Sequence, residues 1–290
     1  MCAVSRTNPR RPFHAALTAA WQRTDAFLCV GLDPLPDRLP VALREEPLAR
    51  AVPTFCREIV RATADQACAF KPQIAHFAAL GLEAELAELI DWIHAEYPTV
   101  PVILDAKRGD IGSTAELYAR EAFERYDADA VTVNPFLGQE GLQPFLDYQD
   151  RGTIVLCRTS NADSAWLQNY PSNSDEPIYV RIAQAAAQWN THGNLMLVAG
   201  GTYPQEIARI REVAGEVGLL VPGIGAQGGD LAAVFHRGAT NDGFGLVVNS
   251  SRGIIYASDQ ADYAVRAGAA ARELADEMRT LRQGANGADL

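Results

Sequence analysis

Short apolar runs alternate along the chain with longer stretches in which apolar residues recur every three or four positions. The short runs predict strands, and the longer stretches predict amphipathic helices. Eight runs are expected to be strands: 27–31, 67–71, 100–105, 130–134, 153–158, 194–199, 219–223 and 243–249. Most of them are apolar throughout instead of alternating with polar residues, which is typical of parallel strands covered on both faces.

The order of these elements predicts eight β/α units. Eight units without a Pro- or Ser-rich linker favour a closed (β/α)8 barrel, the TIM-barrel fold, built as one domain over residues 1–290. The alternative is an open doubly wound sheet, which usually carries a GxGxxG motif after its first strand. Residues 31–34 read GLDP at that position, so this signature is missing.

Further segments complete the predicted barrel. Residues 1–25 are expected to form an N-terminal arm and an extra helix. Helices are also expected at 82–96, 204–215 and 264–282, followed by a frayed tail at 283–290. Residues 160–177 are dense in Ser, Asn, Asp and Pro, and a loop of that length is usually functional or disordered.

Composition argues against several classes of protein. The 25 basic and 36 acidic residues give a formal net charge of −11, so nucleic-acid binding through a general basic surface is not expected. No apolar run approaches the roughly 18 residues that cross a bilayer, so no membrane span is expected. The five cysteines form no CxxC pair, which argues against a zinc site or disulfide framework and fits a reducing cytoplasm. The arginine-rich first 25 residues hold only a short apolar stretch, so a targeting peptide is not expected.

Charged residues gather at the expected carboxyl ends of the second and third strands, where the loops of a barrel form its mouth. Lys71 ends the second strand, and Asp105, Lys107 and Asp110 belong to the third strand and its loop. Side chains two positions apart share a face, so Asp105 and Lys107 are expected to point into the mouth together. Lys71 can reach Asp105 from the neighbouring strand, and Asp110 can join them if the loop folds back. Buried charges are costly unless paired, so four together favour a catalytic site over a solvated ion-pair network at the rim.

Glycine-rich segments after the seventh and eighth strands predict a phosphate site. Gly225 and Gly253 lie in the segments 223–229 and 249–253, whose backbone N–H groups can approach an anion closely. Arg252 can add two parallel hydrogen bonds to a phosphate. The alternative is that these glycines only form tight turns. Loops at these two positions are a recurrent phosphate site in this fold, so a phosphate monoester is expected as ligand.

The segment 105–114 reads DAKRGDIGST and resembles the DxKxxDIxxT signature of the orotidine 5′-phosphate decarboxylase family. This variant is similar to that of the family's longer bacterial subtype. Other similar segments occur in the expected order: GLDP at 31–34, FKP at 70–72, VNP at 133–135, RTSN at 158–161, PGIG at 222–225 and NSSRG at 249–253. The resemblance implies cofactor-independent decarboxylation of orotidine 5′-phosphate to UMP, the last step of UMP synthesis.

The resemblance also implies that four charged residues act together in catalysis. Lys71, Asp105, Lys107 and Asp110 would form the family's catalytic tetrad. Lys107 would give a proton to C6 of the pyrimidine as CO₂ leaves. Asp105 and Lys71 would hold Lys107 in place while contacting the ribose.

Further residues are placed at the substrate by the same resemblance. Asp110, with Ile111 and Thr114, would act in the active site of the partner subunit, so a homodimer is expected. The remaining substrate ligands would be Asp33 for the ribose, Ser160 or its neighbour Thr159 for the amide edge of the pyrimidine, and Gln227 and Arg252 for the phosphate. No cofactor and no metal are expected.

Two other functions stay open. A related barrel that acts on a sugar phosphate, as a decarboxylase or synthase, uses a similar DxKxxD core with a magnesium ion. Residues 111–114 favour the nucleotide enzyme over that alternative. A barrel that only binds a nucleotide or phosphate is the other alternative, and the presence of both lysines and both aspartates argues against it.

Overall fold

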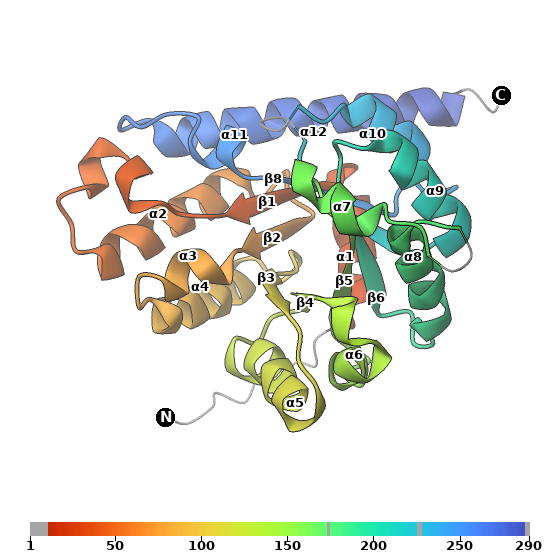
Figure 1. Cartoon of the computed structure of the whole chain (residues 1–290). Helices are drawn as coiled ribbons and strands as arrows, with labels where there is room; N and C mark the ends of the chain where they lie inside the picture. Colours follow the sequence, from red (N-terminus) through yellow and green to blue (C-terminus); the bar gives the residue numbers. More distant parts are fainter. Residues whose placement is uncertain (1–10, 173–174, 225–227, 288–290) are drawn as a thin grey trace.

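Eight parallel strands form the centre of the molecule (Figure 1). The computed structural model describes residues 11–172, 175–224 and 228–287. The strands are β1 (Leu28–Leu32), β2 (Ala69–Pro72), β3 (Ile103–Arg108), β4 (Ala130–Val133), β5 (Gly152–Arg158), β6 (Leu195–Ala199), β7 (Gly218–Pro222) and β8 (Leu246–Ser250). Their order is β2-β1-β8-β7-β6-β5-β4-β3, and neighbours are parallel. All eight predicted strands are confirmed, with each end within three residues of its expected position.

The two outermost strands of this order, β2 and β3, meet and close the sheet into a barrel. Phe70 pairs with Val102, and Gln73 pairs with Asp105, in parallel bridges. The Phe70 amide also donates a hydrogen bond to the Pro101 carbonyl at 3.0 Å. The predicted (β/α)8 barrel is therefore confirmed. Closure brings the carboxyl ends of β2 and β3 side by side at the mouth.

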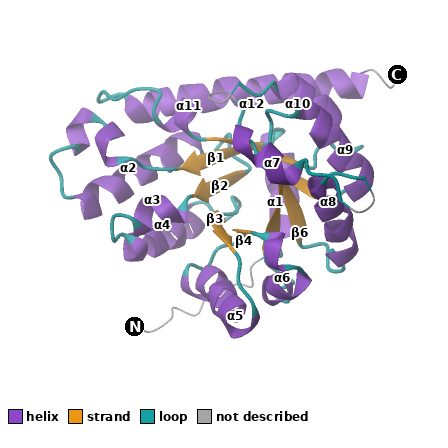
Figure 2. Cartoon of the chain, viewed as in Figure 1, coloured by secondary structure: helices purple, strands orange, loops and turns teal. Residues whose placement is uncertain are grey.

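Helices cover the outside of the barrel (Figure 2). They are α1 (Phe13–Thr24), α2 (Leu48–Thr63), α3 (Ile74–Ala78), α4 (Glu83–Glu96), α5 (Gly112–Arg120), α6 (Gln139–Leu146), α7 (Ala165–Gln168), α8 (Ile178–Trp189), α9 (Pro204–Ala214), α10 (Leu231–Gly238), α11 (Arg252–Ile255) and α12 (Tyr263–Gly287). Short turns add η1 (Pro36–Arg38), η2 (Val41–Leu43), η4 (Pro135–Leu137) and η5 (Ala162–Ser164), and η3 (Glu121–Arg125) continues α5 as a π-helix. The helices expected at 82–96 and 204–215 are confirmed as α4 and α9. No helix among the described residues combines the length and apolar character that a membrane span needs.

The extra N-terminal helix is confirmed as α1, and it packs near the amino ends of the strands. The Phe13 amide donates to the Asp150 carbonyl at 2.9 Å, just before β5 begins. A Cβ atom on Gly152 would lie 2.3 Å from the Phe13 ring, so only glycine allows this close contact. Trp21 stacks on Phe244, which lies just before β8. Helix α1 therefore closes the end of the barrel opposite its mouth.

Helix α12 extends further than expected. The prediction of a frayed tail at 283–290 is wrong for residues 283–287, which are helical, and residues 288–290 lie outside the described part. Arg282 holds the late part of this helix: its Nε donates to the Gly243 carbonyl at 3.1 Å, its guanidinium lies 3.7 Å from the Phe244 ring centroid, and it forms an ion pair with Asp25. This anchoring explains why the helix does not end at 282.

The polar segment 160–177 lies at the mouth and has structure of its own. It contains η5 and α7, and Pro171 pairs with Pro177 in an antiparallel bridge. Figure 1 shows α7 in green over the carboxyl ends of the strands. The long loop predicted from composition is therefore partly helical, with residues 173–174 outside the described part.

Candidate functional site

A pocket of about 490 Å³ opens at the carboxyl ends of the strands. This volume lies within the roughly 300–1,000 Å³ that is typical of small-molecule sites. Seven of the residues expected at the site line it: Asp33 after β1, Lys71 in β2, Asp105 and Lys107 in β3, Ser160 after β5, and Arg252 and Gly253 after β8. Closure of the barrel thus assembles residues that are far apart in the sequence.

Three of the four charged residues expected to lie together do so: Lys71, Asp105 and Lys107 form a charged row at the mouth. The Lys71 Nζ lies 2.9 Å from one Asp105 carboxylate oxygen, and the Lys107 Nζ lies 2.6 Å from the other. Lys71 and Asp105 are buried, with 4 % and 7 % of their surface exposed, whereas Lys107 is open to the pocket. The chain has only two lysines among its 25 basic residues, and both lie in this row. One carboxylate therefore orients two ammonium groups.

The charges of this row shift one another's pKa values. Burial alone would raise the pKa of Asp105, but the charges of Lys71 and Lys107 outweigh burial and hold it well below its usual range. Burial alone would lower the pKa of Lys71, but the charges of Asp105 and Asp33 outweigh burial and raise it above its usual range. Both groups are therefore charged at neutral pH.

Thr132 in β4 orients Asp105 and Lys107 of the charged row. The sequence analysis did not identify this residue. Its Oγ1 donates to Asp105 Oδ1 at 2.8 Å and accepts hydrogen bonds from the backbone amides of Ala106 and Lys107, both at 2.9 Å. The register between β3 and β4 shifts between Leu104 and Arg108. A threonine inside an apolar strand, two positions before Asn134 on the same face, was the available signal.

Lys107 has a left-handed backbone conformation, with φ of 48°. This conformation costs about 1–2 kcal/mol for a residue with a Cβ atom. The amide of Lys107 is held by Thr132, and its ammonium is held by Asp105. Strain of this kind persists where the surrounding contacts over-determine the geometry, which is typical of functional sites.

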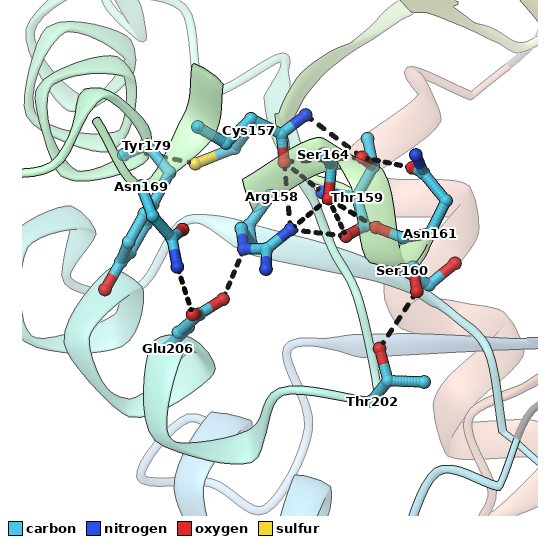
Figure 3. A network of polar contacts seen from close by, with 11 residues as sticks. Cys157, Arg158, Thr159, Ser160, Asn161, Ser164, Asn169, Tyr179, Thr202 and Glu206 are labelled. Carbon is cyan, nitrogen blue, oxygen red and sulfur yellow. Dashed lines mark hydrogen bonds and ion pairs between the residues drawn. The ribbon is translucent and has the colours of Figure 1, made fainter. Parts of the chain in front are cut away.

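The segment after β5 brings two hydroxyl groups to the pocket. The Thr159 hydroxyl is engaged within the segment, because it donates to Asn161 Oδ1 at 2.7 Å and accepts from Gln168 Nε2 at 3.0 Å. The Ser160 hydroxyl has no hydrogen-bond partner among the described residues, and its carbonyl accepts from Thr202 at 3.2 Å (Figure 3). Ser160 therefore has its hydroxyl available to a ligand, whereas Thr159 does not.

Asp33 lies at the β1 side of the pocket. Its Oδ1 is buried and has no hydrogen-bond partner in the described part of the chain. The Tyr256 hydroxyl donates to the Asp33 carbonyl at 3.0 Å and accepts from the Leu35 amide at 2.7 Å, which fixes the backbone around Asp33. A buried carboxylate oxygen without a partner is suited to accept a hydrogen bond from a ligand hydroxyl.

The expected phosphate ligands are described only in part. Arg252 and Gly253 begin α11 and line the pocket, and Gly223 at the end of β7 lines it with φ of 98°, a conformation that favours glycine. Gly225 and Gln227 lie outside the described residues. Arg252 is exposed and presents a guanidinium group at the β8 side of the mouth.

The segment after β3 does not fold back over the row. Asp110 is absent from the pocket lining, and its carboxylate accepts a hydrogen bond from the Ile111 amide at 2.8 Å. Thr114 lies in α5 and is exposed. The side chain of Ile111 is 52 % exposed. The possibility that Asp110 joins the row within its own chain is therefore wrong for this structure.

The cysteines of the described residues do not line the pocket. Four of them, Cys29, Cys56, Cys68 and Cys157, are buried and unpaired. Burial raises the pKa of each thiol, so these residues act as small apolar groups. Within the described ranges, no three His, Cys, Asp or Glu side chains gather in a way that could hold a metal ion.

Comparison with known proteins gives one consistent result. Residues 26–267 match the model of the "Orotidine 5′-phosphate decarboxylase / HUMPS family". The chain is 54 % identical over 271 residues to an orotidine 5′-phosphate decarboxylase of Ralstonia nicotianae, covering 93 % of this chain and 99 % of the relative. It is 55 % identical to an orotidine 5′-phosphate decarboxylase of an Azoarcus species, covering 93 % of this chain and 99 % of the relative. Among solved structures, the OMP decarboxylase of Leishmania donovani superposes with a TM-score of 0.81 at 38 % identity, covering 93 % of this chain and 98 % of that one.

The depressed pKa of Asp105 predicts how its contribution to stability depends on pH. Its charge stabilises the folded state fully above the unfolded-state pKa of about 3.9, and this contribution is lost as pH falls toward the lower folded value. Asp105→Asn leaves Lys71 buried without its partner. We expect it to lower the free energy of unfolding at pH 7 by about 3–5 kcal/mol.

Denaturant unfolding of both proteins between pH 7 and pH 3 measures this difference. We expect it to shrink below about pH 4, because the Asp105 carboxylate of the unfolded wild-type chain then takes up a proton while that of the folded protein stays charged. Asp147→Asn, at an exposed carboxylate in the α6 region, is the control and should change stability by less than about 0.5 kcal/mol. A difference for Asp105→Asn that stays constant over this range would contradict the depressed pKa.

Proposed function

Because the chain belongs to the orotidine 5′-phosphate decarboxylase / HUMPS family, we propose that it converts orotidine 5′-phosphate to UMP and CO₂, the last step of UMP synthesis. The observation that carries this proposal is the charged row at the mouth of the closed barrel, in which Asp105 orients Lys71 and Lys107. The same pocket presents Arg252 to a phosphate and Ser160 to a nucleobase. One pocket therefore offers a group for each part of a nucleotide.

Lys107 supplies the chemical step. Breaking the bond between C6 and the carboxylate leaves an electron pair in the plane of the pyrimidine ring, where the π system cannot accept it. The ammonium of Lys107 stabilises this pair and then gives it a proton, which forms the C6–H bond of UMP. A fixed cation stabilises a developing negative charge most strongly where water is excluded. Asp105 holds the ammonium in place before the reaction begins, and Lys71 in turn holds the Asp105 carboxylate.

The other parts of the substrate provide binding energy. Enzymes lower barriers by roughly 8–23 kcal/mol, and this decarboxylation lies toward the upper end. Contacts far from the reacting carbon can supply part of that reduction. We assign the ribose to Asp33, the amide edge of the base to Ser160, and the phosphate to Arg252 and Gly253. Gly225 and Gln227 are further proposed phosphate ligands on the basis of the sequence alone.

A homodimer with shared active sites is part of the proposal. Asp110, Ile111 and Thr114 lie outside their own pocket, as residues that act in the partner's site must. The same side of the mouth carries large exposed apolar side chains: Ile111, Leu117, Phe136 and Leu137 are 52 %, 60 %, 78 % and 45 % exposed. Exposed apolar groups in one region indicate an interaction surface. A second copy of this chain accounts for both observations.

Three finer assignments accompany this function. We propose that the chain acts as one domain of the family's longer bacterial subtype, supported by the DAKRGDIGST motif at 105–114. We place it in the cytoplasm, supported by its buried, unpaired cysteines. We expect it to work without cofactor or metal, and chelation tests this directly.

The first prediction concerns the reaction and its central residue. The protein should decarboxylate orotidine 5′-phosphate in buffer with EDTA, and Lys107→Ala should lower kcat by more than about 10³-fold while UMP still binds. The loss follows from removal of both the cation and the proton donor. The measurement is the change in ultraviolet absorbance as orotidine 5′-phosphate becomes UMP.

Three results would contradict this prediction. Activity that EDTA removes and Mg²⁺ restores would indicate a magnesium-dependent sugar-phosphate enzyme instead. Binding of UMP without any turnover of orotidine 5′-phosphate would indicate a nucleotide-binding barrel. Normal turnover by Lys107→Ala would refute the role of this residue, and Arg266→Ala, an exposed cation on α12, is the control for loss of a positive charge.

The second prediction concerns the shared site. Each site needs Lys107 from one subunit and Asp110 from its partner, so Lys107→Ala and Asp110→Ala should each be inactive alone. In a heterodimer of the two variants, one of the two sites has both residues. Random mixing of equal amounts makes half of the dimers heterodimers, so about a quarter of the wild-type activity should return. Two different affinity tags verify that heterodimers form, and no recovery in purified heterodimers would exclude Asp110 acting across the interface.

A further inference from the structure

Arg158 is the largest fully buried side chain of the described residues that carries a charge, and the proposed reaction makes no use of it. It ends β5, it is 1 % exposed, and it does not line the pocket. Its guanidinium forms an ion pair with Glu206 in α9 (Figure 3). It also lies 3.9 Å from the centroid of the Tyr203 ring. The side chain therefore points away from the substrate, into the wall between β5 and α9.

The same guanidinium organises the segment that follows β5. Its Nη1 donates to the Thr159 carbonyl at 2.8 Å, to the Ser164 hydroxyl, and to Gln168 Oε1 at 3.2 Å. Gln168 Oε1 in turn accepts from the Thr159 amide at 2.9 Å. The buried Arg158 guanidinium thus connects Thr159, which lines the pocket, to η5 and α7. Figure 3 shows part of this network.

Ser160 is held from the opposite side by the end of β6. Thr202 donates from its hydroxyl to the Ser160 carbonyl at 3.2 Å. A Cβ atom on Gly200 would lie 2.8 Å from both the Ser160 N and Cα, so glycine permits this close approach. The Ser160 backbone is thus held between β6 and the Arg158 network, and its hydroxyl is left unpartnered among the described residues.

An ion pair such as this one, in which Arg158 is buried and Glu206 is partly buried, contributes little to stability by itself. Removing two charges from water often costs as much as their attraction returns, and well-packed apolar residues of similar size can replace such a pair without loss. Its better-supported benefit is to select one geometry among several. Besides Glu206 and Tyr203, the partners of the Arg158 guanidinium are all in the segment that carries Ser160.

We propose that the Arg158–Glu206 pair is a positioning device for nucleobase recognition, in which Arg158 fixes the 159–168 segment so that the Ser160 hydroxyl meets the pyrimidine. The inference rests on the proposed function, because it assigns the base-reading role to Ser160. The described groups at the ribose and phosphate end come from other strands: Asp33 follows β1, Lys71 lies in β2, and Arg252 and Gly253 follow β8. Among the described residues, none of these four forms a hydrogen bond or ion pair with Arg158. Loss of the pair should therefore weaken recognition of the base and leave recognition of ribose phosphate unchanged.

The test compares UMP with ribose 5-phosphate, which lacks the base, as ligands in calorimetry. The double variant Arg158→Met/Glu206→Leu removes both charges, so neither is left buried alone. We expect its UMP affinity to fall about 10-fold or more, with unchanged affinity for ribose 5-phosphate and a lower kcat for orotidine 5′-phosphate. Arg209→Met, which removes the partly exposed ion pairs of Arg209 with Glu176 and Glu212 from the same helix α9, is the control and should change neither affinity.

A double-mutant cycle separates positioning from a general structural effect. In a Ser160→Ala background, the Arg158→Met/Glu206→Leu substitutions should cause little further loss of UMP affinity, because their effect acts through the missing hydroxyl. Equal losses for UMP and ribose 5-phosphate, full additivity with Ser160→Ala, or unchanged UMP affinity would each overturn the inference. In those cases, decarboxylation of orotidine 5′-phosphate by the wild-type protein would still support the proposed function. A wild-type protein without turnover overturns the proposed function and this inference with it.

Discussion

The site depends on one carboxylate that is shared between two ammonium groups. Asp105 holds Lys71 with one oxygen and Lys107 with the other, while Thr132 donates a third hydrogen bond to it. A buried carboxylate is costly unless its charge is compensated, and here two cations compensate it. Lys107 is thus held at its ammonium group by Asp105, and its own backbone takes a strained left-handed conformation.

The use of lysine in this chain is selective. All other basic side chains are arginines, and the two lysines both occur in the row around Asp105. A guanidinium group stays protonated in proteins and cannot act as a proton donor at neutral pH, whereas an ammonium group can give up a proton. Arginine instead serves where permanent charge and several fixed hydrogen bonds are needed, as at Arg158. In the proposed reaction, Lys107 accordingly transfers the proton, and Arg252 binds the phosphate.

Much of the fold and of the charged row could be predicted from the sequence. The eight strands appeared as apolar runs because parallel strands covered on both faces need apolar residues throughout. The contact of Lys71 with Asp105 followed from barrel closure, which makes strands two and three neighbours. Asp110 could not be placed by such reasoning, because its position depends on the conformation of the segment after β3, which no periodic pattern in the sequence specifies.

Other features depend on tertiary contacts that leave no periodic signal. Thr132 looks like an ordinary strand residue, and its role appears only once the register shift of β3 brings the Lys107 amide to it. Arg158 occurs within a run of polar residues that seemed to belong to the pocket, yet its side chain faces the opposite way. The extent of α12 was likewise set by a distant contact, since Arg282 reaches Phe244.

The most direct test of this account is the crystal structure of the protein with bound UMP. The account predicts that the Lys107 Nζ lies within about 3.5 Å of C6, with Asp105 still bonded to it. It also predicts that the phosphate lies at Arg252 and that the amide edge of the base lies at Ser160. A complex in which Lys107 turns away from the pyrimidine, or in which the base occupies another part of the pocket, would contradict it.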